Sequence, residues 1–378
     1  MRYSESLIRL VNSWTAQTTE NKDPFVSTHN VWTDLAIEAT EVIQAAEKQE
    51  IPGANIEVID GKYAKVTRTG ILTPQATRIL GKMPGHYSTI EAPQMRQRNR
   101  DLQEEVSQLF ATEIGRFLKK IGPDAPVLIV GLGNWNATPD AIGPRVVHHL
   151  LITRHLHQHV PQELVGGLRP VCAIAPGVMG TTGIETGEIV LGIVKQIKPA
   201  LVIAVDALAS RSVDRVCTTI QISDTGINPG AGIGNRRLGI TPESLGIPVI
   251  AVGIPTVVQA TTLVNDALRI IEGDQTEPAP PPKVRFGPMH FSDQQQTPEP
   301  ESPEEEKPIN RLAALSQLGP AEKNQIIAEL LHPFLGSLIM TPKEIDVFID
   351  DMAQVVAGGL NAALHSSIHL DEVLKYLN

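Results

Sequence analysis

The sequence GLGNWNATPDAIGP, residues 131–144, lies between a short apolar run at 127–130 and a segment with helical patterning at 145–151. A buried strand, a glycine-rich turn and a helix in this order are typical of loops that bind phosphate at a helix N-terminus. This loop, however, contains a carboxylate, Asp140, which a phosphate group would repel. The stretch therefore predicts either a nucleotide site or a loop that presents Asp140 for chemistry.

Short β-branched runs recur from about residue 125 to residue 272 and alternate with helix-length segments and Gly/Pro turns. This alternation is typical of βαβ units, and strands that are apolar along their whole length indicate helices on both faces of the sheet. We therefore expect an α/β fold with a doubly wound, mostly parallel sheet flanked by helices. The strand-like runs are APVLIVGLG, PVCAIAP, PALVIAVDA, VCTTIQIS and PVIAVGIP.

The residues that precede this unit are predicted to form an N-terminal arm and small α+β additions. Residues 1–34 mix polar and apolar positions, and we expect an N-terminal arm there. A core over residues 35–272 then begins with a helix over 35–48, followed by strand-like pieces and a long helix over 94–121. The additions therefore belong to the same domain as the parallel unit.

The sequence after residue 272 changes in composition twice. Residues 273–309 are rich in Pro, Glu and Gln and poor in branched aliphatic residues, so burial cannot offset the entropy of ordering them. We expect a disordered insert. Helical patterning returns over residues 310–378, with Thr341 predicted as the N-cap of the main helix, and this part is expected to complete the core domain.

Composition restricts the classes of function. The chain has 378 residues, 42% of them hydrophobic, and a net charge of −10, which argues against a nucleic-acid partner because phosphate contacts need clustered Lys and Arg. Its two cysteines lie in apolar strand-like runs and the N-terminus has no signal pattern, so we expect a cytoplasmic protein. No apolar stretch reaches the roughly 20 residues that cross a bilayer, and membrane insertion is not expected.

A second carboxylate occupies a position equivalent to that of Asp140. The run LVIAVDALASR places Asp206 at the end of a strand, and residues just past the carboxyl ends of parallel strands converge on one crevice. Two carboxylates in one crevice titrate apart, so that one keeps a proton while the other is ionised. Asp140 and Asp206 are therefore a candidate general acid and base pair for hydrolysis of a peptide bond.

Other interpretations of the loop fit less well. A dinucleotide site needs a third glycine where Asn136 stands, and no acidic residue closes a second strand at the usual distance. A loop like that of peptidyl-tRNA hydrolase needs a Pro-Gly pair and a nearby catalytic His. For Asp140 considered alone, a purely structural interpretation also remains: a solvated carboxylate near the start of a helix, where the helix dipole favours it.

A metal site is the main chemical competitor. Such sites usually add His or Cys to the carboxylates. The histidines nearest the loop form a cluster on the helix predicted to follow it, and its spacing is also that of a polar helix face. We expect neither a metal nor another cofactor. The clustered histidines are His148, His149, His155, His157 and His159.

Two Gly/Thr-rich segments, 175–188 and 223–237, are expected to line the same crevice as Asp140 and Asp206.

Long segments of the chain resemble a known family. They include VGLGNWNATPDAIGP, APGVMGTTGIET, VIAVDALASR, TTIQISDTGINPGAGIGN and MTPKEIDVFIDDMAQVVAGGLNAALH. With these segments the chain resembles the germination protease, or spore protease, family of spore-forming bacteria. The loop with Asp140 and the strand with Asp206 also resemble the acidic positions of hydrogenase maturation proteases, which implies that the core has their fold.

The resemblance implies a function and its setting. It implies an endopeptidase that degrades small acid-soluble spore proteins at germination, with Asp140 and Asp206 as the catalytic pair. It also implies a homotetrameric, self-processing zymogen in the cytoplasm of the forespore, later the spore core. The alternatives are a metal-dependent endopeptidase of the hydrogenase maturation type and a non-catalytic binding protein on the same fold.

The segment TDLAIEA at residues 33–39 resembles the cleavage motif of this family, in which the cut follows an acidic residue and precedes an apolar residue and Ala. The Asp34-Leu35 bond is therefore the expected self-cleavage bond. A structural alternative is that Thr33 caps a helix whose first turn is stabilised by Asp34 and Glu38. The two interpretations are compatible.

Overall fold

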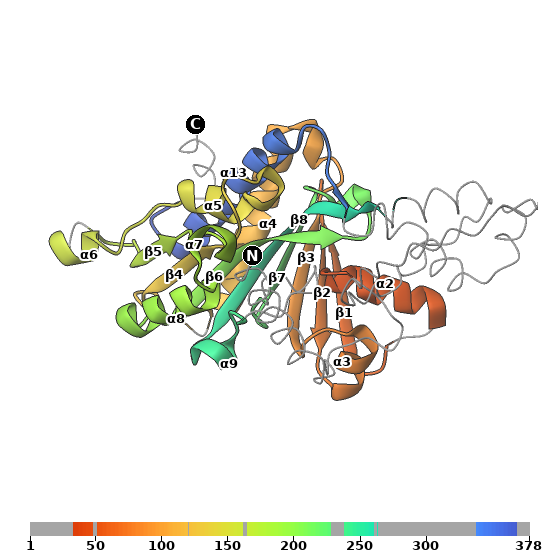
Figure 1. The fold of residues 1–378 in the computed structure, drawn as a ribbon, viewed down its shortest axis with the longest axis horizontal. Helices are drawn as coiled ribbons and strands as arrows, with labels where there is room; N and C mark the ends of the chain where they lie inside the picture. Colours follow the sequence, from red (N-terminus) through yellow and green to blue (C-terminus); the bar gives the residue numbers. More distant parts are fainter. Residues whose placement is uncertain are drawn as a thin grey trace, which may run out of the picture.

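The computed structural model describes residues 33–47, 51–119, 121–161, 165–227, 238–260, 263 and 338–368. The strands of this part form one sheet in the order β1-β2-β3-β7-β8-β6-β4-β5, with β9 paired to β8 (Figure 1). The predicted insert at 273–309 and nearly all of the predicted arm lie outside the described residues. The domain boundaries at 34, 272 and 309 therefore stay predictions.

The centre of the sheet is parallel, as predicted. Strands β4 (Val127–Gly131), β5 (Val171–Ile174), β6 (Leu201–Ser210) and β8 (Val249–Gln259) pair in the order β5-β4-β6-β8, each parallel to its neighbour. Every residue of β4 and most residues of β6 and β8 are buried, because helices cover both sheet faces. The mixed α/β class, with parallel strands at the centre of the sheet, is confirmed.

The predicted α+β additions extend this same sheet with antiparallel strands, so the sheet as a whole is not mostly parallel. Strand β7 (Thr219–Ser223) pairs antiparallel with β8, and β3 (Gly85–Glu91), β2 (Lys65–Ile71) and β1 (Ala54–Asp60) continue outward antiparallel to one another. The short link between β1 and β2 requires this direction, since a parallel pair needs a long crossover. Strand β9 (Ile339–Met340) is antiparallel to β8.

Alternate residues of the central strands face different helices. Val127 and Ile129 of β4 pack in the core that contains α4 (Arg100–Leu118), α5 (Ile142–His148) and α13 (Ile345–Leu364). Leu128 and Val130 pack instead with α8 (Thr186–Ile197) and α9 (Pro242–Leu245). Helices α2 (Ala36–Glu47) and α3 (Pro74–Leu80) pack on β2 and β3 (Figure 1). The short elements are η1 (Met95–Gln97), η2 (Thr138–Asp140), α6 (Leu156–His159), α7 (Met179–Thr182) and η4 (Val213–Arg215).

Helix α13 is a core helix. Among the described residues it alone is long and apolar enough to cross a membrane, yet most of it is buried, and it packs against α4 and α5. The prediction that Thr341 caps it is wrong, because the Thr341 hydroxyl donates to the carbonyl oxygen of Thr256 in β8 (2.9 Å) and the helix begins after Glu344. Thr341 therefore ties the chain to the sheet before the helix starts.

The close approach of α5 to the sheet gives a stability prediction. A Cβ atom on Gly143 would lie 2.3 Å from the Leu132 carbonyl oxygen and 2.6 Å from that of Val205, whereas a Cβ on the exposed Gly192 of α8 meets nothing within 4 Å. Gly143→Ala should lower the free energy of unfolding by about 1–3 kcal/mol, because backbone atoms cannot move aside. Gly192→Ala should raise it by about 0.5–1 kcal/mol through helix propensity. Denaturant unfolding checks both, and equal stability of the two variants would contradict the prediction.

Candidate functional site

The loop at 131–144 folds back on its own carboxylate. The Asn134 N–H lies 3.0 Å from the Asp140 carbonyl oxygen and 2.9 Å from Asp140 Oδ2. Gly133 has φ +113°, and a Cβ there would lie 2.0 Å from the Asp140 carbonyl oxygen. The glycine therefore makes room for Asp140. The Asn134 backbone N–H, which could have bound a phosphate, donates instead to the Asp140 carboxylate. This arrangement favours presentation of Asp140 over a nucleotide site.

Asp206 lies on β6 one residue beyond the last pair between β4 and β6, in which Gly131 is opposite Val205. Its Oδ1 accepts the N–H of Ala207 (3.0 Å). Burial is the main cause that raises the pKa of Asp206 to about 8, and the negative charge of Asp140 adds to it. The loop and the strand therefore bring the two predicted carboxylates close enough to couple, and Asp206 is the one that holds a proton at neutral pH.

A third carboxylate, Asp34, joins this pair. The Asp34 N–H donates to the Ala209 carbonyl oxygen of β6 (3.4 Å), and the Ala209 N–H donates to Asp34 Oδ2 (2.8 Å). Burial raises the pKa of Asp34, and its negative charge contributes to the raised pKa of Asp206. The structure therefore holds the expected self-cleavage bond against β6, the strand that carries Asp206.

Lys82 supplies the positive charge at Asp34. Its ammonium group donates to the carbonyl oxygen of Thr33. Burial lowers the pKa of Lys82, while the negative charges of Asp34 and Glu38 oppose that shift. Lys82 follows α3 in a stretch that belongs to no motif, so the sequence carried no signal for its role.

Gln221 of β7 contacts both sides of Leu35. Its side-chain Nε2 donates to the Asp34 carbonyl oxygen (3.3 Å), and its Oε1 accepts the N–H of Ala36 (2.6 Å). Leu35 itself is fully buried. The only signal for Gln221 in the sequence was a polar residue in the middle of a buried strand, which needs hydrogen-bond partners.

Glu38 anchors the first turn of α2. Its carboxylate accepts the backbone N–H groups of Arg211 (2.9 Å) and Ser212 (3.1 Å), and the Arg215 guanidinium lies 3.4 Å away. Thr33 Oγ1 accepts the Leu35 N–H (3.1 Å), but α2 begins at Ala36, so Thr33 closes a local turn before the helix and does not occupy the predicted N-cap position. The acidic residues of this segment do more than stabilise a helix, because they dock it on β6 and the turn after that strand.

The clustered histidines do not lie on one helix. Helix α5 ends at His148, and His157 and His159 lie on the separate helix α6. His148 packs edge-on against Trp135 and His149, and His149 Nε2 lies 3.9 Å from Asp350. In the part of the chain that the structure describes, no group of three or more His, Cys, Asp or Glu side chains is placed to hold a metal ion.

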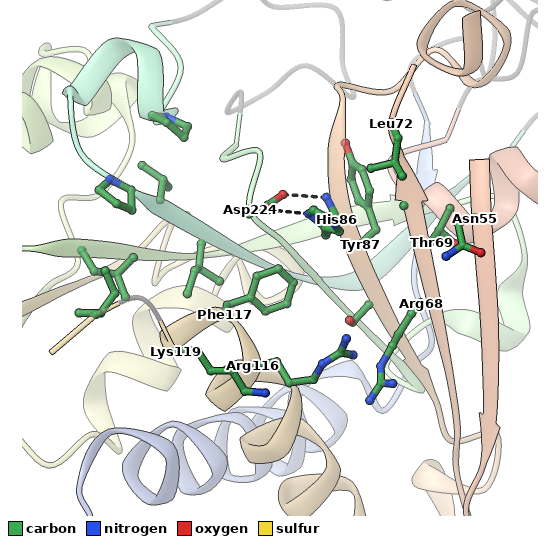
Figure 2. Close-up of a pocket in the computed structure, with 18 of the residues that line it drawn as sticks. Asn55, Arg68, Thr69, Leu72, His86, Tyr87, Arg116, Phe117, Lys119 and Asp224 are labelled. Atoms are coloured by element: carbon green, nitrogen blue, oxygen red, sulfur yellow. Dashed lines mark hydrogen bonds and ion pairs between the residues drawn. The ribbon is translucent and has the colours of Figure 1, made fainter. Parts of the chain in front are cut away.

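A cavity of about 700 Å³ lies at the other end of the sheet (Figure 2). Leu201 and Val249, the first residues of β6 and β8, line it, whereas Asp206 lies in the second half of β6. His86 and Asp224 both line this cavity, and His86 Nδ1 lies 3.0 Å from Asp224 Oδ2. Asp224 belongs to the segment 223–237 that was expected to line the crevice with the carboxylates, so its described beginning instead contributes to this cavity.

Comparison with known proteins identifies the family. The family model for germination protease matches residues 33–377. The chain is 46% identical to the germination protease of Halalkalibacterium halodurans, over 92% of this chain and 97% of that protein. It is 44% identical to the germination protease of Bacillus cereus and 45% identical to that of Bacillus velezensis, in both cases over 94% of this chain and 99% of the relative. The chain therefore belongs to the germination protease family, and it is a peptidase.

Among solved structures, a [NiFe] hydrogenase maturation protease from Thermococcus kodakarensis is similar to part of the chain. It is 18% identical and covers 38% of this chain and 80% of its own, with a TM-score of 0.25. A likeness at this level carries no argument about fold or chemistry. The family assignment rests on the germination proteases alone.

The raised pKa of Asp206 predicts how stability depends on pH. Its pKa is about 8 in the folded chain, against an ordinary value of 3.8. The folded state therefore binds a proton that the unfolded state releases, so this stabilising contribution is complete below pH 4 and is lost as the pH rises through 8. Asp206→Asn should remove that loss and gain stability relative to the parent between pH 4 and pH 8, as measured by denaturant unfolding.

Asp140→Asn is the matched variant for this experiment. It removes a charge that raises the pKa of Asp206. The loss of stability in this variant should therefore be complete at a lower pH than in the parent. A loss of stability that is complete at the same pH in the parent and in Asp140→Asn would show that the two carboxylates are not coupled.

Proposed function

We propose that this peptidase is an endopeptidase that starts the degradation of small acid-soluble spore proteins at germination, with Asp140 and Asp206 as the pair that activates water. The support is the position of Asp206 at the end of the pairing between β4 and β6, next to the loop that holds Asp140, where burial and the charge of Asp140 raise the pKa of Asp206 to about 8. A pair that titrates apart supplies an acid and a base at the same pH. The sequence leaves the two roles open, and the raised pKa favours Asp206 as the acid.

The proposed reaction moves protons between water, the peptide and the pair. Asp140 accepts a proton from water as the water oxygen attacks the carbonyl carbon, and Asp206 gives its proton to the carbonyl oxygen. The C–N bond then breaks, and the leaving amine takes the proton that Asp140 holds. Asp206 regains its proton from the hydroxyl of the new carboxyl group. The step needs one water molecule and leaves both side chains as they began.

We also propose that the chain is made as a zymogen that cuts its own Asp34-Leu35 bond. The support is the placement of Asp34, which is hydrogen-bonded to β6 and electrostatically coupled to Asp206. Lys82 beside Asp34 supports a preference for an acidic residue before the cut. Assembly as a homotetramer in the forespore cytoplasm follows from the family resemblance and belongs to the same proposal.

The pair is tested by replacing each carboxylate. Asp140→Asn and Asp206→Asn should each slow cleavage of a small acid-soluble spore protein by about 100-fold or more, because each removes the acid or the base. Asp60→Asn at the exposed end of β1 is the control and should cleave at the parent rate. Cleavage is followed by gel electrophoresis, and a near-normal rate in either site variant would rule out the pair.

The same assay separates the alternatives. Activity that disappears on treatment with a chelator and returns with a divalent ion would replace the pair with metal-dependent hydrolysis. A parent chain that binds the spore protein without cutting it would support a non-catalytic binding protein. The proposal predicts cleavage that a chelator leaves unchanged.

The cut site is tested by N-terminal sequencing after incubation in mild acid. The proposal predicts Leu35 as the new first residue in the parent chain and no cut in the Asp206→Asn chain. Lys82→Met should give the same cut more slowly, because the charge beside Asp34 is lost. A new terminus elsewhere, or substrate cleavage by uncut full-length protein, would contradict the zymogen.

A further inference from the structure

Gln221 uses both halves of its side-chain amide on one short piece of backbone. Nε2 donates to the Asp34 carbonyl oxygen (3.3 Å) and Oε1 accepts the Ala36 N–H (2.6 Å). A carbonyl oxygen can only accept and an N–H can only donate, so the two partners fix which amide atom is nitrogen. The carbonyl that Gln221 contacts belongs to the bond between Asp34 and Leu35.

The sheet places Gln221 level with Asp206. Gln221 of β7 is opposite Gly253 of β8, and Gly253 is opposite Asp206 of β6. Residues in register across neighbouring strands point to the same face, so the Gln221 and Asp206 side chains lie on one face of the sheet. Two strand spacings separate their strands, a distance of about 10 Å. Ile220 and Ile222 face the core of α4 and α13, in agreement with Gln221 facing the other way.

The residue between them, Gly253, has no side chain, and the Leu208 side chain of β6 occupies the space that a Cβ there would take, 2.3 Å from Leu208 Cδ1. The segment that contains Asp34 is held in this region by Ala209 of β6 and by Gln221 of β7. A peptide held in this way has its carbonyl oxygen on the Gln221 amide and its acidic side chain on β6.

We infer that Gln221 is a further catalytic residue, whose Nε2–H donates to the carbonyl oxygen of the peptide bond that is cut. This inference rests on the proposed function, because it takes Asp34-Leu35 as that bond. When water attacks, the carbonyl oxygen gains negative charge, and a fixed donor binds it more strongly than it binds the ground state. Gln221 transfers no proton, so the proton balance of Asp140 and Asp206 is unchanged.

Two substitutions separate the donor from the docking contact. Gln221→Met removes both hydrogen bonds with a side chain of similar length, whereas Gln221→Glu keeps an acceptor for the Ala36 N–H and loses the donor when ionised. Both should slow self-cleavage at neutral pH by about 100- to 1,000-fold, the range for a lost oxyanion donor. Ser223→Ala, two residues along β7 and bonded to Thr225, should stay within about threefold of the parent, because it loses no oxyanion donor.

The pH profile is the measurement that a merely structural role would not change. A protonated Glu carries an O–H donor, so Gln221→Glu should recover self-cleavage as the pH falls, and Gln221→Met should not. Thermal unfolding of the full-length chains confirms that each variant is folded. Cleavage by folded Gln221→Met within about threefold of the parent would overturn the inference, as would Gln221→Glu that cuts normally at neutral pH or stays inactive in acid.

Failure of the inference and failure of the proposed function give different results. If the parent is cut at another bond, or if Asp206→Asn still cuts itself, the proposed function fails whatever the Gln221 variants do. If the cut generates Leu35 and needs Asp206, but Gln221→Met cuts normally, only the role of Gln221 fails. N-terminal sequencing of every cleaved variant makes this distinction.

Discussion

The carboxyl group of Asp206, held on a parallel strand beside Asp140, is the constraint on which the rest of the site depends. Burial disfavours its ionised form and the neighbouring charge of Asp140 adds to that effect, so Asp206 keeps its proton at neutral pH. Such proximity requires the loop after β4 to return close to β6. The missing side chains of Gly133 and Gly143 make room for that return, since a Cβ at either would collide with backbone.

The same end of the sheet binds residues 34–38 of its own chain as well as holding the pair. Residues Asp34 to Glu38 contact β6, β7 and the turn after β6 through backbone and side-chain hydrogen bonds. Leu35 is fully buried and α2 begins at the next residue. The segment is thus fixed on both sides of the Asp34-Leu35 bond, which reduces the entropy cost of bringing this bond to the carboxylates.

The local sequence predicted the parallel strands and the two carboxylates, because a strand and the residue at its end are neighbours along the chain. Lys82 and Gln221 could not be predicted as site residues in this way, since their roles come from contacts with residues far away in sequence. Gln221 is 187 residues from Asp34. The continuation of the sheet into antiparallel strands depends on the pairing of β7 with β8, which strand patterns alone do not specify.

The charges in the site also influence how the products of the proposed cut separate. The negative charges of Asp140 and Asp34 both act on Asp206, and the positive charge of Lys82 acts on Asp34. Hydrolysis of the Asp34-Leu35 bond would add a new carboxylate to Asp34 in this acidic setting. Like charges at short distance in a poorly solvated site repel strongly, and the link that held Asp34 to α2 would no longer exist. The reaction itself would therefore weaken the hold on the peptide before Leu35, which favours release of the arm and frees the pair for a second substrate.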